Sequence, residues 1–163
     1  MKNLLLILSS IFCMLSIPSC TEVECPLDSV VVMTCGLYDA DSHEKLSISH
    51  TLSVTPAGKD TLLLNSASDI QSFVLPLKMG ENCDTMLLHF SDSWDQTCTD
   101  TLYLHHENLP HFESVECPAT IFHKLKQVTW ANDRQSNLNV SIDSVVIVRE
   151  LVDYNDVENI TIL

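Results

Sequence analysis

The chain has 163 residues, of which 22 are Asp or Glu and 8 are Lys or Arg, so its formal charge is −14. An acidic surface of this kind repels the phosphate backbone of DNA and RNA, which excludes nucleic acid as a partner. The hydrophobic fraction of 45% is ordinary for a globular protein and predicts one folded domain with a real core.

The N-terminus has the pattern of an export signal. Lys2 precedes an apolar run over residues 4–15, which has the length of a signal-peptide core and is shorter than the about 20 residues of a permanent membrane span. The run leads into Ile17-Pro18-Ser19-Cys20, which resembles a bacterial lipobox. We therefore expect a lipoprotein signal peptide over 1–19, lipidation at Cys20 and a lipid-anchored linker over 20–28. The alternative is an ordinary secretory signal, with Cys20 as an unmodified thiol.

The residues after Cys20 bear on location. Thr21 in place of Asp resembles lipoproteins that are sorted to the outer membrane, and Glu22 and Glu24 faintly resemble the acidic stretch of surface lipoproteins. We expect the bacterial outer membrane, with the periplasmic and cell-surface sides both open. The N-terminal lipid must supply the membrane affinity, because so acidic a chain has no basic patch for headgroups.

From residue 29 onward, apolar residues come in short bursts rich in Val, Ile, Leu and Thr, separated by Asp, Ser, Asn and Pro. This spacing is typical of strands and not of helices. Eight or nine strands predict an all-β fold, an antiparallel β-sandwich over residues 29–163. The predicted strands are 29–38, 48–55, 60–65, 71–77, 84–91, 97–106, 121–130, 143–151 and 158–163.

One short pattern recurs at the start of three predicted strands: Asp60-Thr61-Leu62, Asp84-Thr85-Met86 and Asp100-Thr101-Leu102. The spacings of 24 and 16 residues are unequal, which excludes a regular repeat architecture. We interpret the pattern as local chemistry at strand entry, where Asp favours the preceding turn and Thr favours the strand.

The chain has seven cysteines. Removal of Cys13 with the signal, and of Cys20 with the lipid, leaves five for an oxidising compartment. None of the spacings is that of a zinc knuckle or a Cys-x-x-Cys redox motif. The preferred bridge joins Cys25 to Cys117, because each precedes a proline at an apparent strand boundary. The pairing among the remaining three stays open: Cys35, Cys83 and Cys98.

The order of short motifs along the chain resembles a family of small lipoproteins from Bacteroides-type bacteria that carries only a domain-of-unknown-function label. The motifs are the lipobox, the Asp60–Asn65 strand, Val74-Leu75-Pro76-Leu77, residues 100–104 running into Pro110-His111-Phe112, Cys117-Pro118, residues 142–146 and residues 159–162. Pro118 and the extra cysteines depart from that pattern. The resemblance implies an anchored β-rich domain and carries over no catalytic residue.

Two clusters invite a metal hypothesis. His89, His105, His106 and His111 fall near one predicted hairpin, but neighbours on a strand point to opposite faces unless a bulge intervenes. A loop with two aspartates and a glutamate over residues 39–44 lacks the glycine and spacing of a calcium loop. We expect no metal, with polar histidines and a solvated acidic turn.

Trp94 is the most suggestive single residue, because an aromatic ring on an acidic loop can stack on a sugar or on a partner's apolar patch. We favour the alternative that it folds back over the end of the sandwich. A glycan- or peptide-binding module would require Trp94 or Tyr103 on an exposed face.

The sequence contains no Gly-x-Ser-x-Gly elbow, no His-Glu-x-x-His helix and no catalytic cysteine signature. Its three glycines are too few for a phosphate or dinucleotide loop. We therefore predict a lipid-anchored cell-envelope lipoprotein with no cofactor and a non-enzymatic structural or protein-binding role, whose partner is an envelope protein or a glycan. The first alternative is a surface glycan- or peptide-binding module, and a more distant one is a metal-dependent hydrolase that uses the histidines.

Overall fold

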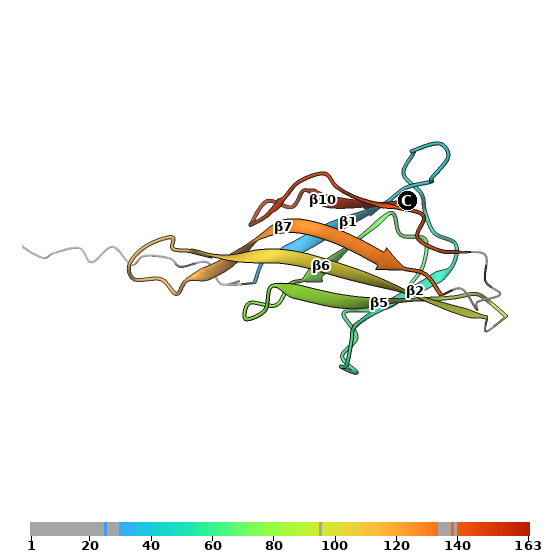
Figure 1. The fold of residues 1–163 in the computed structure, drawn as a ribbon, viewed down its shortest axis with the longest axis horizontal. Helices are drawn as coiled ribbons and strands as arrows, with labels where there is room; N and C mark the ends of the chain where they lie inside the picture. The colour runs from blue at the N-terminus through green and yellow to red at the C-terminus, as the bar shows by residue number, and fades with distance from the viewer. Residues whose placement is uncertain (1–24, 26–29, 95, 134–137, 139) are drawn as a thin grey trace, which may run out of the picture.

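The computed structural model describes residues 25, 30–94, 96–133, 138 and 140–163. The predicted signal peptide, Cys20 and all of the predicted linker except Cys25 lie outside these residues. The described chain is all β, with ten strands in two sheets (Figure 1). No helix that could cross a membrane is found among the described residues.

The two sheets have four and six strands. In order across the smaller sheet lie β4 (Ser72–Pro76), β1 (Val32–Leu37), β10 (Glu158–Ile162) and β8 (Val145–Ile147). In order across the larger sheet lie β3 (Leu64–Ala67), β2 (Thr51–Pro56), β5 (Cys83–Ser91), β6 (Thr97–His111), β7 (Thr120–Ala131) and β9 (Leu151–Val152).

A single hydrophobic core joins the two sheets, as predicted for a sandwich. Met33 and Ile160 enter it from the smaller sheet, and Leu88 and Leu102 from the larger one, all fully buried. Along β5 buried and half-buried residues alternate strictly, because successive side chains of a strand point to opposite faces. The inner face thus packs the core, and the outer face meets solvent.

Three features differ from the predicted strands. β1 and β10 pair in parallel, whereas the other strand pairs are antiparallel. The predicted strand 60–65 is displaced to β3 at the edge of the larger sheet. The predicted strand 143–151 is two strands, because the chain leaves the smaller sheet after Ile147 and joins the larger one at Leu151.

Asn159 holds the crossing between the sheets. Its side chain is 1% exposed, and its Oδ1 accepts the N–H of Thr34 at 3.1 Å, where the β1–β10 register shifts. Its Nδ2 donates to the carbonyls of Arg149 and Leu151 at 3.3 and 2.9 Å. One buried amide therefore serves three backbone groups that the crossing leaves without a ladder partner.

We expect Asn159→Ala to lower the free energy of unfolding by about 2–3 kcal/mol, because it leaves buried backbone groups without hydrogen bonds. A urea titration measures the loss. The matched control is the exposed Asn155, whose change to alanine should cost less than about 1 kcal/mol. Equal effects of the two substitutions would contradict the role of Asn159.

The molecule is elongated along β6, whose 15 residues span about 50 Å. The connection from β6 to β7 lies at one end, and the connection from β5 to β6 at the other (Figure 1). The predicted disulfide between Cys25 and Cys117 is present at the β6–β7 end. It ties the start of the described chain to that connection.

Candidate functional site

Two of the three recurring aspartates lie inside strands and not in the turns before them. Asp84 in β5 and Asp100 in β6 are both 0% exposed. The interpretation as strand-entry chemistry is therefore wrong for both. A signal was present in the sequence, because Asp84 and Asp100 are in phase with the apolar residues two and four positions later and so must share the inner face.

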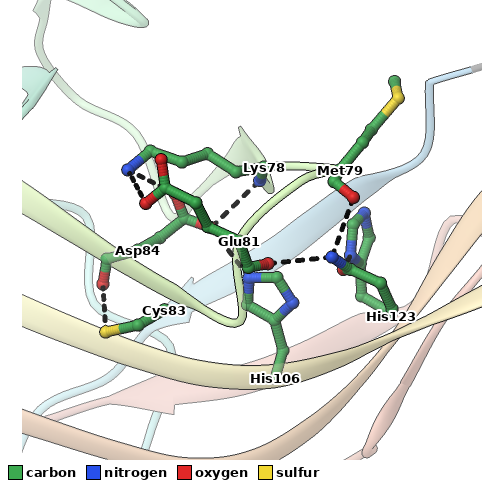
Figure 2. A network of polar contacts seen from close by, with 8 residues as sticks. Lys78, Met79, Glu81, Cys83, Asp84, His106 and His123 are labelled. Atoms are coloured by element: carbon green, nitrogen blue, oxygen red, sulfur yellow. Dashed lines mark hydrogen bonds and ion pairs between the residues drawn. The ribbon is translucent and has the colours of Figure 1, made fainter.

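Asp84 is the centre of a buried polar network (Figure 2). Its Oδ2 lies 2.9 Å from Nε2 of His106 in β6 and accepts the backbone N–H of Lys78 at 3.0 Å. The ammonium of Lys78 lies 3.9 Å from Oδ1 and donates to Glu81 at 2.8 Å. The side chains of Asp84 and His106 are 1% and 0% exposed. The network thus fixes the β4–β5 connection from its buried side.

His123 in β7 extends the network (Figure 2). Its ring meets that of His106 edge to face, with centroids 4.9 Å apart, and its Nδ1 lies 2.7 Å from Oδ1 of Asn108. The amide nitrogen of Asn108 donates to the carbonyls of Met79 and Glu81 at 2.9 and 2.8 Å. Because that oxygen can only accept, the Nδ1 of His123 carries the proton.

The pKa of His123 is lowered from 6.5 to about 4, mainly by burial and also by the adjacent His106, while Asp84 opposes the shift. The ring is therefore neutral at neutral pH. A neutral ring can pack against His106 without charge repulsion and still donate one hydrogen bond to Asn108.

The low pKa predicts a pH-dependent stability. As the pH falls from 6.5 toward about 4, the unfolded chain binds a proton that the folded His123 does not, so the protein loses about 3 kcal/mol of stability over this range. Urea titrations at several pH values measure the loss, and His123→Gln should remove that contribution. Protonation of the His123 ring near pH 6.5 in the folded protein, seen by NMR, would contradict the prediction.

A pocket of about 200 Å³ opens beside Asp84. Its lining is mostly apolar and includes two lysines: Pro56, Leu63, Leu77, Met86, Lys59 and Lys78. Among the cations that the structure describes, Lys59 has no carboxylate within ion-pair distance. The pocket has room for a small apolar group, with Lys59 available to an acidic one.

The Asp84–His106 pair has no nucleophile beside it in the described chain. The thiol of the neighbouring Cys83 donates to the carbonyl of Asp84 at 3.9 Å, and its side chain leaves the strand on the opposite face. His106 itself is enclosed. Geometrically the pair is a buried tie between strands and a loop.

Asp100 forms a second tie of the same kind. Its Oδ2 accepts the N–H of Ile142 at 2.8 Å, and its Oδ1 accepts the N–H of Asp133 at 3.0 Å. The thiol of Cys98 contacts the same Oδ1 at 3.7 Å. The carboxylate therefore holds the chain on both sides of residues 134–141 against β6.

The four histidines of the metal hypothesis do not meet. His89 lies between Thr55 and Thr99 on the outer face, at 2.9 and 3.0 Å. His105 is exposed whereas His106 is buried, although a register shift of the β6–β7 ladder falls between them. His111 stacks on Phe122. Among the described residues no three His, Cys, Asp or Glu side chains are arranged to hold a metal ion.

The acidic loop of residues 39–44 is closed by its own side chains. Asp39 accepts the N–H groups of Ser42 and Asp41 at 2.8 and 3.2 Å. These hydrogen bonds, that of Ser42 first, hold the pKa of Asp39 below its usual range. The loop is an exposed turn capped by the Asp39 carboxylate.

Trp94 does not fold back over the sandwich, which corrects the favoured expectation. The Oδ1 of Asp92 accepts the N–H groups of Trp94 and Gln96 at 2.8 and 2.9 Å. The Asp92 carboxylate thereby closes the turn without a contact from the indole, which is 82% exposed. Tyr103 is half-buried on the outer face of β6, about 20 Å of strand beyond Thr97. The structure does not bring Trp94 and Tyr103 into one site.

The three remaining cysteines stay outside disulfides. Cys35 is fully buried, and burial raises the pKa of its thiol, which leaves it unreactive. Cys98 contacts Asp100 and Cys83 the carbonyl of Asp84, as described above. No second bridge forms among them.

Comparison with known families assigns the chain. A family model described as "Family of unknown function (DUF6452)" matches residues 51–163. The chain belongs to the DUF6452 family. A search of curated proteins and a search of solved structures each found no match.

The DUF6452 match begins at the first residue of β2 and runs to the end of the chain. It therefore includes both buried aspartates, the two histidines of the network and Cys117, but neither β1 nor Cys25. The predicted resemblance to a family of unknown function is confirmed at this level.

Proposed function

We propose that this DUF6452 chain is a lipid-anchored lipoprotein of the bacterial cell envelope, at the outer membrane, with a non-enzymatic structural or protein-binding role. The supporting observation is the disulfide between Cys25 and Cys117. Cys25 follows the predicted lipidation site, Cys20, by five residues. The bridge therefore fastens the end of the chain that would carry the lipid to one end of the sandwich.

The buried polar groups support a non-enzymatic role. Asp84 and Asp100 bond to backbone N–H groups of connecting segments, and His106 is enclosed by protein. Catalytic groups must reach a substrate within hydrogen-bond distance. Groups that are buried in this way instead hold loops in place.

The anchor is tested by growing the bacterium with an alkyne-tagged palmitate and isolating the protein. We expect the label in the wild type and in Cys13→Ser, and its absence from Cys20→Ser, which should also leave the membrane fraction. Label in Cys20→Ser, or an unlabelled wild type, would overturn the proposal. Protease treatment of intact and lysed cells then distinguishes the two faces of the membrane, because a surface domain is cleaved without lysis.

The exposure of Trp94 favours a second candidate, a surface glycan- or peptide-binding module. The indole is 82% exposed and belongs to the β5–β6 connection. That connection lies at the end of the molecule opposite the β6–β7 connection (Figure 1), where an anchored domain would present it away from the bilayer. Such a ring stacks well on a sugar or an apolar side chain. On a glycan and peptide array, we expect the wild type and Tyr103→Phe to bind the same ligand and Trp94→Ala to lose that binding. Unchanged binding by Trp94→Ala would exclude this site.

A further inference from the structure

Exposed apolar side chains gather at the β6–β7 end of the molecule. Phe112 and Val115, on the connection after His111, are 64% and 102% exposed. Val30 is 48% exposed and forms a bridge with Ile121, the second residue of β7, just after the same connection. Large apolar side chains that stay exposed at one end of a domain are candidates for contact with a membrane or another molecule.

Hydrogen bonds and the disulfide fix the backbone of the connection, so the exposed apolar side chains are held at defined positions. The hydroxyl of Ser114 donates to the sulfur of Cys117 at 3.4 Å and accepts the N–H of Glu116 at 3.1 Å. The disulfide then fixes Cys117 to Cys25, with Cα atoms 5.5 Å apart. Where the connection meets the first residue of β7, the hydroxyl of Tyr154 donates to Thr120 at 2.7 Å.

The length of the tether places this end beside the lipid. Five residues separate Cys20 from Cys25, and five residues span at most about 18 Å when fully extended. The disulfide adds 5.5 Å between Cα atoms. The acyl chains thus lie within roughly 25 Å of the connection, whereas the other end of β6 is about 50 Å away.

We infer that Phe112 and Val115 dip into the boundary between headgroups and acyl chains of the bilayer that holds the lipid. This inference rests on the proposed lipidation of Cys20. Apolar and aromatic side chains are stable at that depth, and a preformed connection loses little conformational entropy on insertion.

The charges on the connection determine which lipid surface it fits. Glu113 pairs with His111 at 3.1 Å, and Glu116 is exposed nearby. Two carboxylates beside the apolar side chains disfavour an anionic surface, so the contact requires zwitterionic headgroups. Two apolar side chains cannot hold an acidic domain by themselves, so the unlipidated chain should not bind vesicles.

The test uses the full lipidated protein in phosphatidylcholine vesicles with or without acyl chains brominated near the headgroup. The chain has two tryptophans, and Trp94→Phe removes the exposed one. In that background Phe112→Trp places a reporter on the connection, and Val146→Trp, at a position on β8 that is 49% exposed, is the matched control. We expect bromine to quench the emission added by Phe112→Trp, because the inferred depth brings the ring near the headgroup end of the acyl chains, and to leave that added by Val146→Trp unchanged.

The outcomes separate the inference from the anchor. If the protein isolated from the bacterium carries no lipid and does not float with the vesicles, the proposed anchor and this inference are overturned together. A lipidated chain that floats but shows equal emission in both vesicle types overturns the inference alone. Emission from the Phe112→Trp reporter that shifts with protein concentration and not with bromine would identify a second copy as the occupant, and would likewise overturn it.

Discussion

Replacing Asp100 by alanine is expected to lower the free energy of unfolding by about 3–5 kcal/mol. The carboxylate is 0% exposed and accepts two backbone N–H groups, from Ile142 at 2.8 Å and from Asp133 at 3.0 Å. Alanine leaves both donors without this acceptor and opens a cavity near the start of β6. Urea unfolding followed by far-UV circular dichroism measures the loss.

The controls separate the hydrogen bonds from the burial of a charge. Asp100→Asn keeps one acceptor oxygen and should cost less than alanine, about 1–3 kcal/mol. Thr101→Ala, next along β6 on the outer face, should cost less than about 1 kcal/mol. If Asp100→Leu proved as stable as the wild type, the carboxylate would not be holding residues 133 and 142, and the account of this tie would be wrong.

Loss of the disulfide is the second large effect. Cys25 and Cys117 are 92 residues apart, and closing a loop of that length stabilises the folded state by about 4.5 kcal/mol in the chain-entropy model. Cys117→Ser should therefore remove a large fraction of the free energy of unfolding, which is measured as a lower urea midpoint. A reducing agent should do the same to the wild type.

Two control variants test whether the loss of stability comes from the Cys25–Cys117 bridge. A reducing agent should leave the stability of the Cys25→Ser/Cys117→Ser variant unchanged, because no other disulfide joins the described cysteines. Cys83→Ser, which removes a half-buried thiol outside the bridge, should have little effect. A wild type equally stable in oxidised and reduced buffers would exclude a stabilising role for the bridge.

Local pattern was sufficient wherever the physics is local. Alternating apolar residues predicted most of the strands, because a strand that buries one face must repeat every two residues. The prolines that follow Cys25 and Cys117 were interpreted as signs of strand boundaries, and this interpretation led to the correct bridge. The parallel pairing of β1 with β10 was missed, since its partners lie more than a hundred residues apart and no turn fixes their register.

The candidate site was missed for a related reason. An aspartate before Thr-Leu or Thr-Met satisfies the local rule for a turn, but Asp84 and Asp100 are buried because their partners arrive from other parts of the chain. His106 comes from the neighbouring strand, and Ile142 from 42 residues further on. The free-energy cost of burying a carboxylate is offset only where several hydrogen-bond donors surround it.

By itself the sequence determined an acidic, all-β, disulfide-bridged domain, since charge, strand period and cysteine position are properties of the chain taken locally. Tertiary structure decided which polar residues are internal and which aromatic ones are external. The Asp92 turn leaves Trp94 outside, and the network around Asp84 draws two histidines inside. The physical reason is that burial depends on partners far along the chain, and only the folded arrangement brings those partners together.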